Sequence, residues 1–520
     1  MDSIELEILW SNLESIVTEQ ARALQRVAFS PIVREAGDLA TALFDGRARV
    51  VAQTTAGTPG HINSLAAAGA TMAERFKDKL EPGDVLVTND PWIGAGHFFD
   101  ITVMAPAFME DKLIGYVGAT AHHTDIGGYG LGAGARDVHE EGLWIPPAKL
   151  YERGQPNALL HDIIRHNVRT PDYVFGDLAA QVSSCRTGAE RLVAICRAHN
   201  LQDIEGLSDE IIFRSEAATR RAIRQLRSGT SHGESHFDGP GGELITLKSA
   251  VTVDVDAGEI TVDFVGSSPQ SKVGINVVMN YTHAYAAFAV RSCLNPEVPN
   301  NHGSLAPIRI VAPKGCIVNC SYPAPVNARH VVGMYVPMPI LKALFEFMPD
   351  RVIAEGAGSV WTVQVQGSHD DGKNFISSVF NYSGGMGARA GKPGLSATCF
   401  PAGVSAVPVE ILEAAMPIVF ERKEIRRGSG GQGMFRGGDG QVISFKMNTR
   451  NPWVLNVSPA CLTEGPEGLA GGGRGMPGRC FINGEAFSES RKIAMQPDDL
   501  VVLETPGGGG YGAVRRTVAA

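Results

Sequence analysis

Residues 100–123 read DITVMAPAFMEDKLIGYVGATAHH, two apolar runs that are separated by Glu110 and Asp111. Short apolar runs bounded by polar residues are typical of buried β-strands. The polar pair between them is a turn signal, so we predict two neighbouring strands joined by a turn. The stretch GDVLVTNDP, residues 83–91, predicts a further buried strand just before them. The first half of the chain is therefore expected to contain a sheet.

Helical patterns surround this predicted sheet. Residues 4–28 predict a long amphipathic helix with a polar face of Glu and Gln. Its apolar positions are Leu6, Leu9, Leu13, Ile16, Val17 and Leu24. A hairpin is predicted around residues 45–46, and a second helix over residues 61–80. Residues 172–228 predict two or three helices, whose many Arg side chains alternate with Glu and Asp as on a solvated face.

The character of the sequence changes near residue 232. Alternating strand patterns follow, as in residues 245–266, and glycine-rich stretches appear at residues 426–440 and 505–512. The chain has 61 glycines, but apolar strands such as WVLNV and DLVVLE keep returning between them. This combination indicates a turn-rich β region rather than disorder.

These patterns together predict an α+β fold with two parts. Residues 1–231 are expected to form a helical, mixed-sheet part that carries the functional motifs. Residues 232–520 are expected to form a β-rich, glycine-rich part with interspersed helices. No internal repeat of fixed period is visible.

Composition excludes several classes of protein. The 520 residues are 44% hydrophobic, so the chain can bury large cores and is expected to be globular. A formal net charge of -9, without a block of Lys and Arg, argues against nucleic acid as a partner. The N-terminus is acidic and amphipathic, and no run of about 18 apolar residues occurs. We therefore expect a cytoplasmic protein without a membrane partner.

Neither cysteines nor glycines form a recognisable cofactor motif. Cys316 and Cys320 are close together but lack a second pair that would complete a zinc ribbon, so we interpret them as buried thiols. A phosphate-binding loop needs Gly, four residues, and then Gly-Lys-Ser/Thr. The nearest approach, GGMGARAGKP at residues 384–393, has the wrong spacing and a proline in place of the hydroxyl. We therefore predict that this chain has no ATP site.

A metal site is suggested by two neighbouring motifs. In NDPWIGAGHFFDIT, residues 89–102, His97 stands three residues before Asp100, and AHHTDIGG brings His122 and His123 shortly afterwards. Imidazole and carboxylate are common ligands of Zn, Mn, Fe and Co. His97 and Asp100 would face opposite ways in a regular strand, so they converge only if the flanking glycines allow a turn. His122 or His123 would arrive from the neighbouring strand.

A structural explanation of the same residues stays open at this point. The pattern His-x-x-Asp is common, and either side chain could form hydrogen bonds within its own loop. Asp38 and His61 are likewise ambiguous, because both stand where a turn or a helix start is expected. Spacing alone therefore leaves both explanations in place.

Nine motifs in order along nearly the whole chain resemble the hydantoinase B/oxoprolinase family. They are ALFDGRARVVAQ, TPGHINS, GDVLVTNDPWIGAGHFFDITVMAPAF, AHHTDIGG, EEGLWIPPAKLYERG, HNVRTPDYVFGDLAAQ, VPVEILEAAMPI, GSGGQGMFRGGDG and TPGGGGYG. The family includes B-type subunits of ATP-dependent hydantoinases and lactamases, the second half of 5-oxoprolinase, and subunits of acetone and acetophenone carboxylases. The resemblance implies an A-type partner that binds ATP, and hence a hetero-oligomer.

The resemblance also implies a metal and its ligands. Relatives of the acetone carboxylase type bind a transition metal, usually manganese, through a His-x-x-Asp pair and a later His, which match His97, Asp100 and His122 here. His123 occupies a position where relatives vary. The divalent metal is expected to be Mn, Zn or Fe. The chain has GHFFD where THLPD is usual, and residues 428–431 lack a usual Asp, so its substrate contacts are expected to differ.

The function that the resemblance implies is ATP-dependent opening of a cyclic amide, a hydantoin, oxoproline or lactam. The partner would phosphorylate the amide oxygen, and this B-type subunit would deliver water to the activated intermediate. The candidates for proton transfer, or for orienting the metal ligands, are Asp38, His61, Asp90 and Asp125.

Three other functions remain to be tested against this one. The same architecture would also serve an ATP-dependent ketone carboxylase. In that reaction the activated ketone, and not water, would be the nucleophile, and it would attack carbon dioxide. A non-catalytic scaffold for the A-type partner would not need the cluster of His and Asp. A stand-alone oxygenase with two His and one carboxylate fits the residue types, but the family resemblance argues against it.

Overall fold

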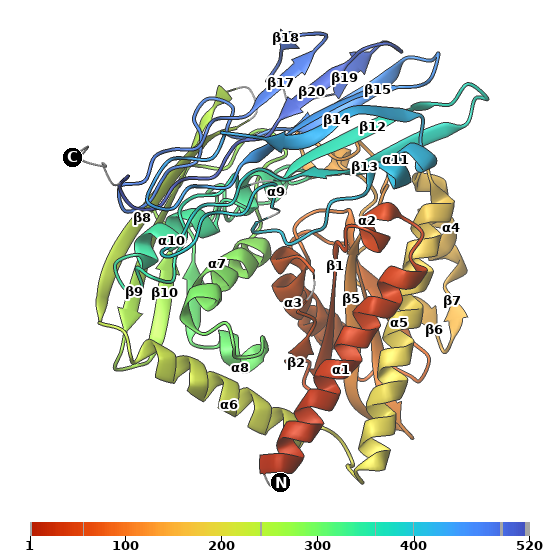
Figure 1. Ribbon diagram of the computed structural model, residues 1–520. Helices are drawn as coiled ribbons and strands as arrows, with labels where there is room; N and C mark the ends of the chain where they lie inside the picture. Colours follow the sequence, from red (N-terminus) through yellow and green to blue (C-terminus); the bar gives the residue numbers. More distant parts are fainter. Residues whose placement is uncertain are drawn as a thin grey trace.

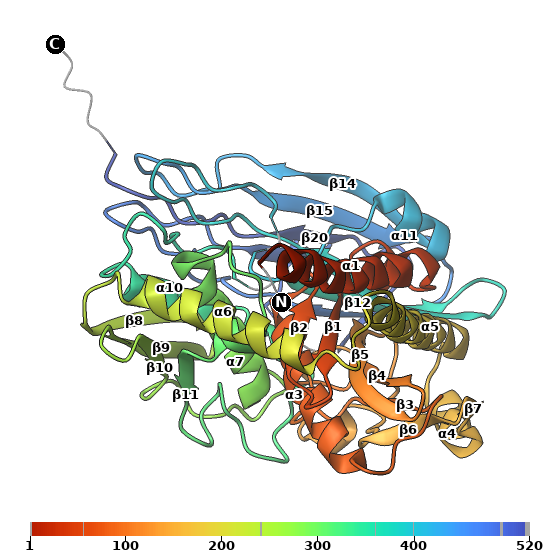
Figure 2. The ribbon, with the colours of Figure 1, turned by 90° about the horizontal axis from the view of Figure 1, so that it is seen from below.

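The computed structural model describes residues 3–55, 57–239, 242–358, 360–398, 400–488 and 492–514. Its helices and antiparallel sheets confirm the predicted α+β class (Figure 1). No helix of the described residues is long and apolar enough to cross a membrane. The C-terminal strands form one layer, and the N-terminal and middle regions lie side by side beneath it (Figure 2).

A seven-stranded antiparallel sheet forms the centre of the N-terminal region. Its strands, in spatial order, are β2 (Val50–Gln53), β1 (Leu39–Asp45), β5 (Lys112–His122), β4 (Asp100–Met109), β3 (Val85–Thr88), β6 (Ala148–Glu152) and β7 (Gln155–Pro156). The predicted turn between β4 and β5 is confirmed, and so is the hairpin of β1 and β2. The register sets Asp100 directly opposite His122, because β4 begins where β5 ends.

Helices cover both faces of this sheet because its side chains alternate. Leu43 and Val117 pack with α1 (Ser3–Val27) and α5 (Pro171–Ala198), and their neighbours Phe44 and Tyr116 pack with α3 (Pro59–Phe76). The prediction of a long opening helix is thus confirmed. The remaining helical elements of this part are α2 (Pro31–Arg34), η1 (Val138–Glu140), α4 (Ala158–Asn167) and α6 (Glu205–Ile223).

Helix α3 differs from its predicted range at both ends. It begins at Pro59, since a proline is well suited to the first helical position. It ends at Phe76, four residues before the predicted end, because Lys77 leaves the helical conformation and Asp78 has a φ of 61°. The two or three helices expected over residues 172–228 are α5 and α6.

The middle region contains a four-stranded sheet and the helices that join it to the N-terminal region. The strands, in spatial order, are β11 (Ile308–Val311), β10 (Glu259–Asp263), β9 (Leu244–Asp254) and β8 (Gly229–Asp238). The helices are α7 (Met279–Leu294), α8 (His302–Leu305), α9 (His330–Gly333) and α10 (Pro337–Leu344). Helix α10 packs on β8 and β9, and α7 packs on both α10 and α3 (Figure 1). Helix α7 therefore connects the two regions.

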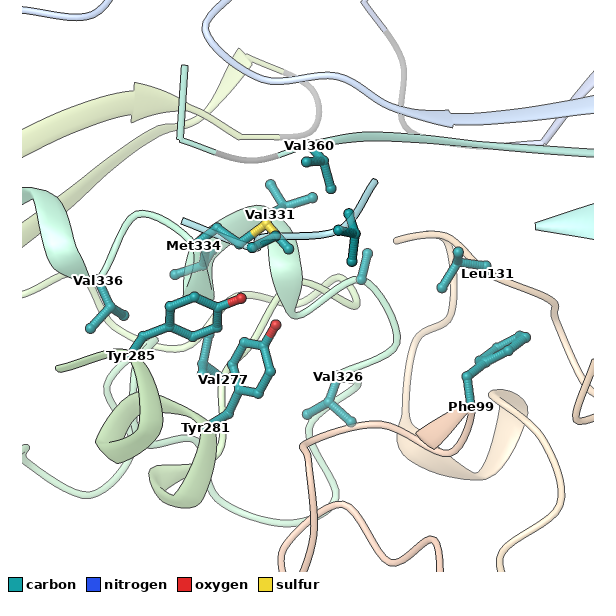
Figure 3. Packing of buried hydrophobic residues seen from close by; sticks show 14 of the residues in the cluster. Phe99, Leu131, Val277, Tyr281, Tyr285, Val326, Val331, Met334, Val336 and Val360 are labelled. Carbon is teal, nitrogen blue, oxygen red and sulfur yellow. The ribbon is translucent and has the colours of Figure 1, made fainter. Parts of the chain in front are cut away.

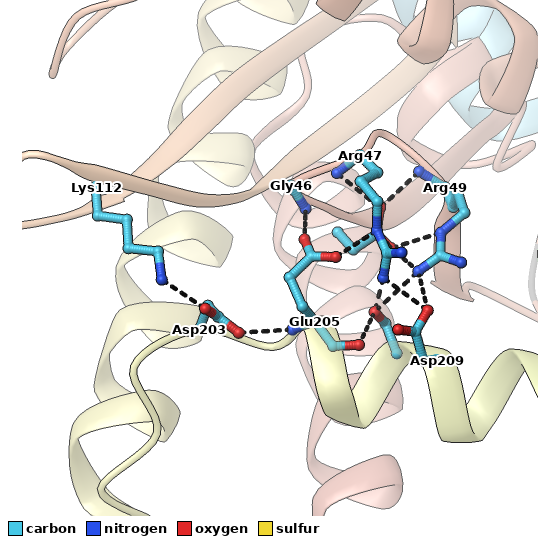
Figure 4. A network of polar contacts seen from close by, with 9 residues as sticks. Gly46, Arg47, Arg49, Lys112, Asp203, Glu205 and Asp209 are labelled. Atoms are coloured by element: carbon cyan, nitrogen blue, oxygen red, sulfur yellow. Dashed lines mark hydrogen bonds and ion pairs between the residues drawn. The ribbon is translucent and has the colours of Figure 1, made fainter.

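A salt-bridged network also holds the N-terminal sheet to α6 (Figure 4). The buried carboxylate of Asp45, at the end of β1, accepts hydrogen bonds from Arg49 and from Ser208 of α6. Glu205 accepts a bond from the backbone N–H of Gly46, and Asp209 accepts one from Arg49. The β1–β2 turn is therefore fixed to the helix that leads into the middle region.

Two further sheets make up the C-terminal layer. One has the order β13 (Asn374–Tyr382), β12 (Trp361–Ser368), β16 (Trp453–Ser458) and β19 (Lys492–Met495). The other has the order β14 (Ile418–Arg426), β15 (Gly440–Met447), β20 (Val501–Glu504), β17 (Arg479–Ile482) and β18 (Glu485–Ala486), with α11 (Val409–Ala415) beside β14. Phe445 and Trp453 join the two sheets through rings whose centroids are 6.4 Å apart.

Beside these sheets lies a layer of glycine-rich chain that packs backbone against backbone; we call it the glycine layer. It is built from residues 384–395, 429–440, 465–476 and 505–512. Gly508 donates its N–H to the carbonyl of Gly438. The N–H of Gly438 in turn donates to the carbonyl of Met386. A Cβ on Gly508 would lie 2.2 Å from the oxygen of Met386, and one on Gly385 would lie 1.9 Å from that of Gly438. The layer therefore has no room for side chains at these positions.

The seven cysteines among the described residues are all buried and free. This confirms the interpretation of Cys316 and Cys320 as buried thiols. Cys399 lies outside the described residues.

Candidate metal centre

Three predicted ligands converge at one end of the first sheet. His97 lies in the loop after β3, Asp100 is the first residue of β4, and His122 is the last of β5. Nε2 of His97 is 2.8 Å from Oδ1 of Asp100, and Nδ1 of His122 is 2.9 Å from the same oxygen. One ligand atom from each residue lies within 4.8 Å of the others. The register of β4 and β5 thus brings His122, rather than His123, to this group.

A glycine allows the loop to turn His97 toward Asp100. Gly96 has a φ of 90°, a conformation that residues with a side chain rarely adopt. A Cβ at this position would also lie 2.8 Å from Cδ of Arg329, a buried arginine beside the site. The loop therefore needs glycine here both for its conformation and for space.

The nitrogen of His97 that faces Asp100 has the properties of a metal ligand. Nδ1 of His97 is 2.9 Å from the carbonyl oxygen of Asn327, which only accepts, so Nδ1 carries the hydrogen. Burial lowers the pKa of His97 to about 3, so the ring is neutral and Nε2 has a free lone pair. This buried nitrogen has no hydrogen-bond partner, although a carboxylate oxygen lies 2.8 Å away. Two acceptors at this distance repel unless a cation lies between them, so the group fits a metal ion.

Asp100 is the centre of a wider buried network. Its Oδ2 lies 2.7 Å from Nε2 of His61 and accepts a hydrogen bond from Arg329. Burial alone would raise the pKa of Asp100, but the charges of His61 and Arg329 outweigh it and hold that pKa well below its usual value. Asp100 is therefore a carboxylate, the form in which it binds a cation.

His61, in the first turn of α3, links Asp100 to Asp38. Its Nδ1 is 3.4 Å from Oδ1 of Asp38, and its Nε2 faces Asp100. Burial would lower the pKa of His61, but the carboxylates of Asp100 and Asp38 outweigh it and raise that pKa. Two of the four predicted proton-transfer candidates are thus brought to the metal ligands.

The other two proton-transfer candidates, Asp90 and Asp125, and also His123, form contacts away from the predicted metal ligands. Asp90 accepts a hydrogen bond from the backbone N–H of Trp92, and Asp125 pairs with Arg169 at 2.7 Å. His123 is held by Gln181 at 2.9 Å on the other side of the strand. None of the three lines the cavity beside the metal ligands, so a catalytic role for Asp90 or Asp125 stays a prediction without support from their positions.

The ligands border a small cavity. Its volume is about 30 Å³, roughly enough for two water molecules. Its lining residues are Ile32, Asp38, Thr58, His61, His97, His122, Leu131, Tyr281, Arg329, His330, Met334, Val360, Thr362, Ala402 and Val404. In Figure 3, the hydroxyl groups of Tyr281 and Tyr285 rise from α7 on the side of Met334 and Val360. The cavity is therefore built by the N-terminal, middle and C-terminal regions together.

Several functional residues were missed by the sequence-based reasoning. Arg329 is buried, its guanidinium carbon lies 4.1 Å from the ring centroid of Tyr281, and it binds Asp100. His330 follows it and its Nε2 is 3.0 Å from Oγ1 of Thr362. A signal was present, because the stretch NARHVVG places an Arg-His pair among apolar residues. Such a pair in an apolar stretch marks a buried charge that needs a partner.

Comparison with known proteins identifies the family of this chain. The model of the family described as hydantoinase B/oxoprolinase matches residues 2–514. The chain belongs to this family. A Pseudomonas sp. (strain NS671) protein named as the putative B-type subunit of a D-/L-hydantoinase is 32% identical, with 98% of this chain and 90% of that protein covered.

Two solved structures share the fold. The ATP-dependent caprolactamase from Pseudomonas jessenii is 25% identical with a TM-score of 0.90, covering 100% of this chain and 92% of that one. An acetone carboxylase in a nucleotide-free state is 20% identical with a TM-score of 0.89, covering 98% and 76%. At that identity the carboxylase shows the common fold alone. The family members named for hydantoin and caprolactam are hydrolases of cyclic amides.

Proposed function

We propose that this chain is the B-type subunit of an ATP-dependent cyclic amide hydrolase that holds a divalent transition metal, Mn, Zn or Fe. His97, Asp100 and His122 would be the ligands. The observation that carries the proposal is the bare Nε2 of His97 facing a buried carboxylate. The hydrolases of cyclic amides in its family support the reaction class.

Activation of the amide is assigned to a partner. The carbonyl of an unstrained amide is a poor electrophile, and phosphorylation of its oxygen turns that oxygen into a leaving group. The chain has no phosphate-binding loop, so an A-type subunit would bind ATP and carry out this step. The relative from Pseudomonas sp., which is itself named as one subunit of a hydantoinase, supports such a hetero-oligomer.

The residues of this chain would position water and manage its proton. When bound, the metal would supply a Lewis acid that lowers the pKa of water or polarises a carbonyl. His61 borders the cavity and holds a proton between the carboxylates of Asp100 and Asp38, so Asp38, which also lines the cavity, would accept the proton of the water with His61 beside it to balance the charge. Arg329 balances the charge of Asp100 and holds its Oδ2 away from the ligand side. The apolar walls formed by Leu131, Met334 and Val360 limit the cavity to a few waters.

The test uses the chain purified together with its A-type partner. Hydantoin, 5-oxoproline and ε-caprolactam are supplied with ATP, and phosphate release and ring-opened product are measured. We expect product from at least one probe, dependent on ATP and on the partner, and bound metal that is lost in His97→Ala. Turnover by this chain alone without ATP would contradict the two-subunit reaction.

Two further outcomes separate the alternatives. Product that forms from acetone or acetophenone only with bicarbonate present would establish a ketone carboxylase instead. Unchanged activity of the complex with His97→Ala, and no bound transition metal in the parent protein, would establish a scaffold.

A further inference from the structure

A second, much larger cavity lies beside the metal cavity; we call it the chamber. Its volume is about 730 Å³, within the usual range for small-molecule sites. It is lined by Glu14, Thr18, Gln53, Thr54, Thr55, Gly57, Pro59, Ile62, Asn63, Phe288, Arg291, Ser292, Pro296, Glu297, Val298, Pro299, Asn300, Thr398, Phe400, Pro401 and Gly403. Thr55, Ser292 and Glu297 are exposed, so the chamber opens to solvent.

One thin wall separates the chamber from the metal cavity. In residues 401–404, Pro401 and Gly403 line the chamber, whereas Ala402 and Val404 line the metal cavity. The same division occurs where α3 begins, because Thr58 lines the metal cavity and Pro59 lines the chamber. The partition is therefore a single layer of chain.

A hydrogen bond between two helices completes the partition. Tyr285 of α7 lies one turn after Tyr281, which lines the metal cavity, and one turn before Phe288, which lines the chamber. Its hydroxyl is 3.2 Å from Oγ1 of Thr58. This contact joins α7 to the start of α3 between the two cavities, and Figure 3 shows the Tyr285 hydroxyl on the same side as that of Tyr281.

Size decides which cavity can hold a substrate ring. The metal cavity has room for about two waters, whereas bound small molecules usually need several hundred Å³. A ring of the hydantoin or lactam kind therefore has to be held outside it first. The chamber is the adjoining space that is large enough.

The lining of the chamber favours an uncharged amide. Asn300 donates hydrogen bonds to the side-chain oxygens of Gln53 and Asn63, which gathers three carboxamides from different elements on one wall. Phe288 and Phe400 supply flat apolar surface. Gln53 and Asn63 donate their own N–H groups to the carbonyls of Ile62 and Ala284, so the wall of carboxamides presents mainly oxygens, which can accept from the N–H of a cyclic amide.

Charges in the chamber argue against an anion as its first occupant. The guanidinium of Arg291 is bound to carbonyl oxygens of its own loop, at Asn295 and Val298. Two carboxylates, Glu14 and Glu297, line the chamber as well. The net charge of the lining is thus negative, which disfavours an anion.

We propose that the chamber is the binding site for the neutral cyclic amide, and that the ring reaches the metal cavity across the partition when the Tyr285–Thr58 contact opens. This inference rests on the proposed function. Because the chamber is open to solvent, a ring bound there is also accessible to the ATP-binding partner.

The first experiment blocks the chamber reversibly in the full chain. Ser292→Cys is treated with methyl and benzyl methanethiosulfonate, and mass spectrometry counts the added groups. Binding of hydantoin and ε-caprolactam, which are neutral, is then followed by ligand-observed NMR. We expect the benzyl adduct to weaken binding at least tenfold, the methyl adduct less, and reducing agent to restore it.

Controls separate this result from general damage and from the metal. Ser183→Cys places the same adduct on the exposed face of α5, which lines neither cavity, and should leave probe binding within twofold. The untreated and treated parent protein reports labelling of native cysteines, including Cys399. Probe binding within twofold in the benzyl adduct of Ser292→Cys would overturn the proposal.

The second experiment tests the partition. Tyr285→Phe removes the hydroxyl contacts with Thr58 and Tyr281 and keeps the ring, so we expect Mn²⁺ to be released to EDTA severalfold faster at an unchanged equilibrium affinity. Tyr335→Phe is the matched control, since its buried hydroxyl binds the carbonyl of Ala357 instead. An unchanged release rate in Tyr285→Phe would contradict the proposed opening of the partition at the Tyr285–Thr58 contact.

The outcomes distinguish this inference from the proposed function. Lost probe binding in the blocked chamber with unchanged Mn²⁺ affinity supports the chamber. Retained Mn²⁺ binding in His97→Ala would contradict the metal centre and leave the probe-binding result standing.

Discussion

The candidate metal centre and the glycine layer are built in opposite ways. At the candidate centre the chain directs side chains to one point, so that Asp100 contacts His61, His97, His122 and Arg329. In the glycine layer the chain brings backbones together and leaves no side chain between them. The first region depends on which functional groups are present, and the second on the absence of any added atom. Substitutions should therefore affect chemistry in one region and folding in the other.

The largest effect is expected at His97. His97→Ala removes a proposed ligand, and the loss of several kcal/mol of metal-dependent stabilisation corresponds to about a thousandfold lower kcat/KM. Activity of the complex and metal content are the measurements. His123→Ala is the matched control, because His123 is also buried but binds Gln181, so it should keep the metal and lower only the melting temperature. Equal loss of metal in both variants would contradict the assignment of His97, and not His123, as a metal ligand.

Adding a methyl group in the glycine layer tests whether the close packing of its backbones is needed for folding. Gly508→Ala would place Cβ 2.2 Å from the oxygen of Met386, so we expect a loss of about 3 kcal/mol or more in the free energy of unfolding. Gly206→Ala in α6 meets nothing within 4 Å and should change stability by no more than about 1 kcal/mol. Similar unfolding midpoints for the two variants would refute the steric account.

Asp45 tests a region where side chains serve folding alone. Asp45→Asn removes the charge that binds Arg49 at 2.6 Å and Ser208 at 3.1 Å, so we expect a loss of about 2 kcal/mol in urea unfolding. Asp209→Asn, at the exposed edge of the same network, should cost less than about 1 kcal/mol. Equal losses of stability in Asp45→Asn and Asp209→Asn would show that the network is stabilised mainly by its exposed side chains.

Glu141 is expected to make the stability of the fold depend on pH. Burial raises the pKa of Glu141 to about 8 from 4.5, so between these values the folded protein keeps a proton that the unfolded chain has released. Stability contributed by this group therefore falls as pH rises through that window, by at most about 1.4 kcal/mol per pH unit. Glu141→Gln should remove this slope, so its stability relative to the parent rises between pH 5 and pH 8. Parallel curves for the two proteins in urea titrations would contradict the raised pKa.

Glu141 lies behind the candidate metal centre. Its Oε1 accepts bonds from the N–H groups of Val326 and Asn327 at 2.7 and 2.8 Å. The carbonyl of Asn327 in turn fixes the ring of His97. The centre thus depends on a buried acid that does not border the cavity.

Local patterns in the sequence predicted the parts of the fold that local forces determine. The strands on either side of Glu110 were predicted from apolar runs, and the opening helix from its periodicity. The register of β4 and β5 could not be predicted from the turn, because a bulge between Ala107 and Phe108 shifts the pairing by one residue. Without that shift Asp100 would lie opposite Ala121 and not opposite His122.

Contacts between distant parts of the chain could not be predicted in this way. Arg329 reaches Asp100 across 229 residues, and no spacing links them. The glycine layer was missed for a different reason, because backbones that pack without side chains show no hydrophobic alternation. The division near residue 231 stays a prediction, although the largest hydrophobic cluster contains residues from both sides of it.

The position of residues 505–512 in the glycine layer has a consequence for synthesis on the ribosome. Gly508 donates to Gly438, Gly509 to Glu355, and Gly510 to Gly473, so this late segment is inserted among three earlier ones. The N-terminal sheet can fold while translation continues, but the layer has no complete backbone pairing until these residues emerge. A nascent chain therefore carries a finished first sheet and an open C-terminal layer until residues 505–512 have been synthesised.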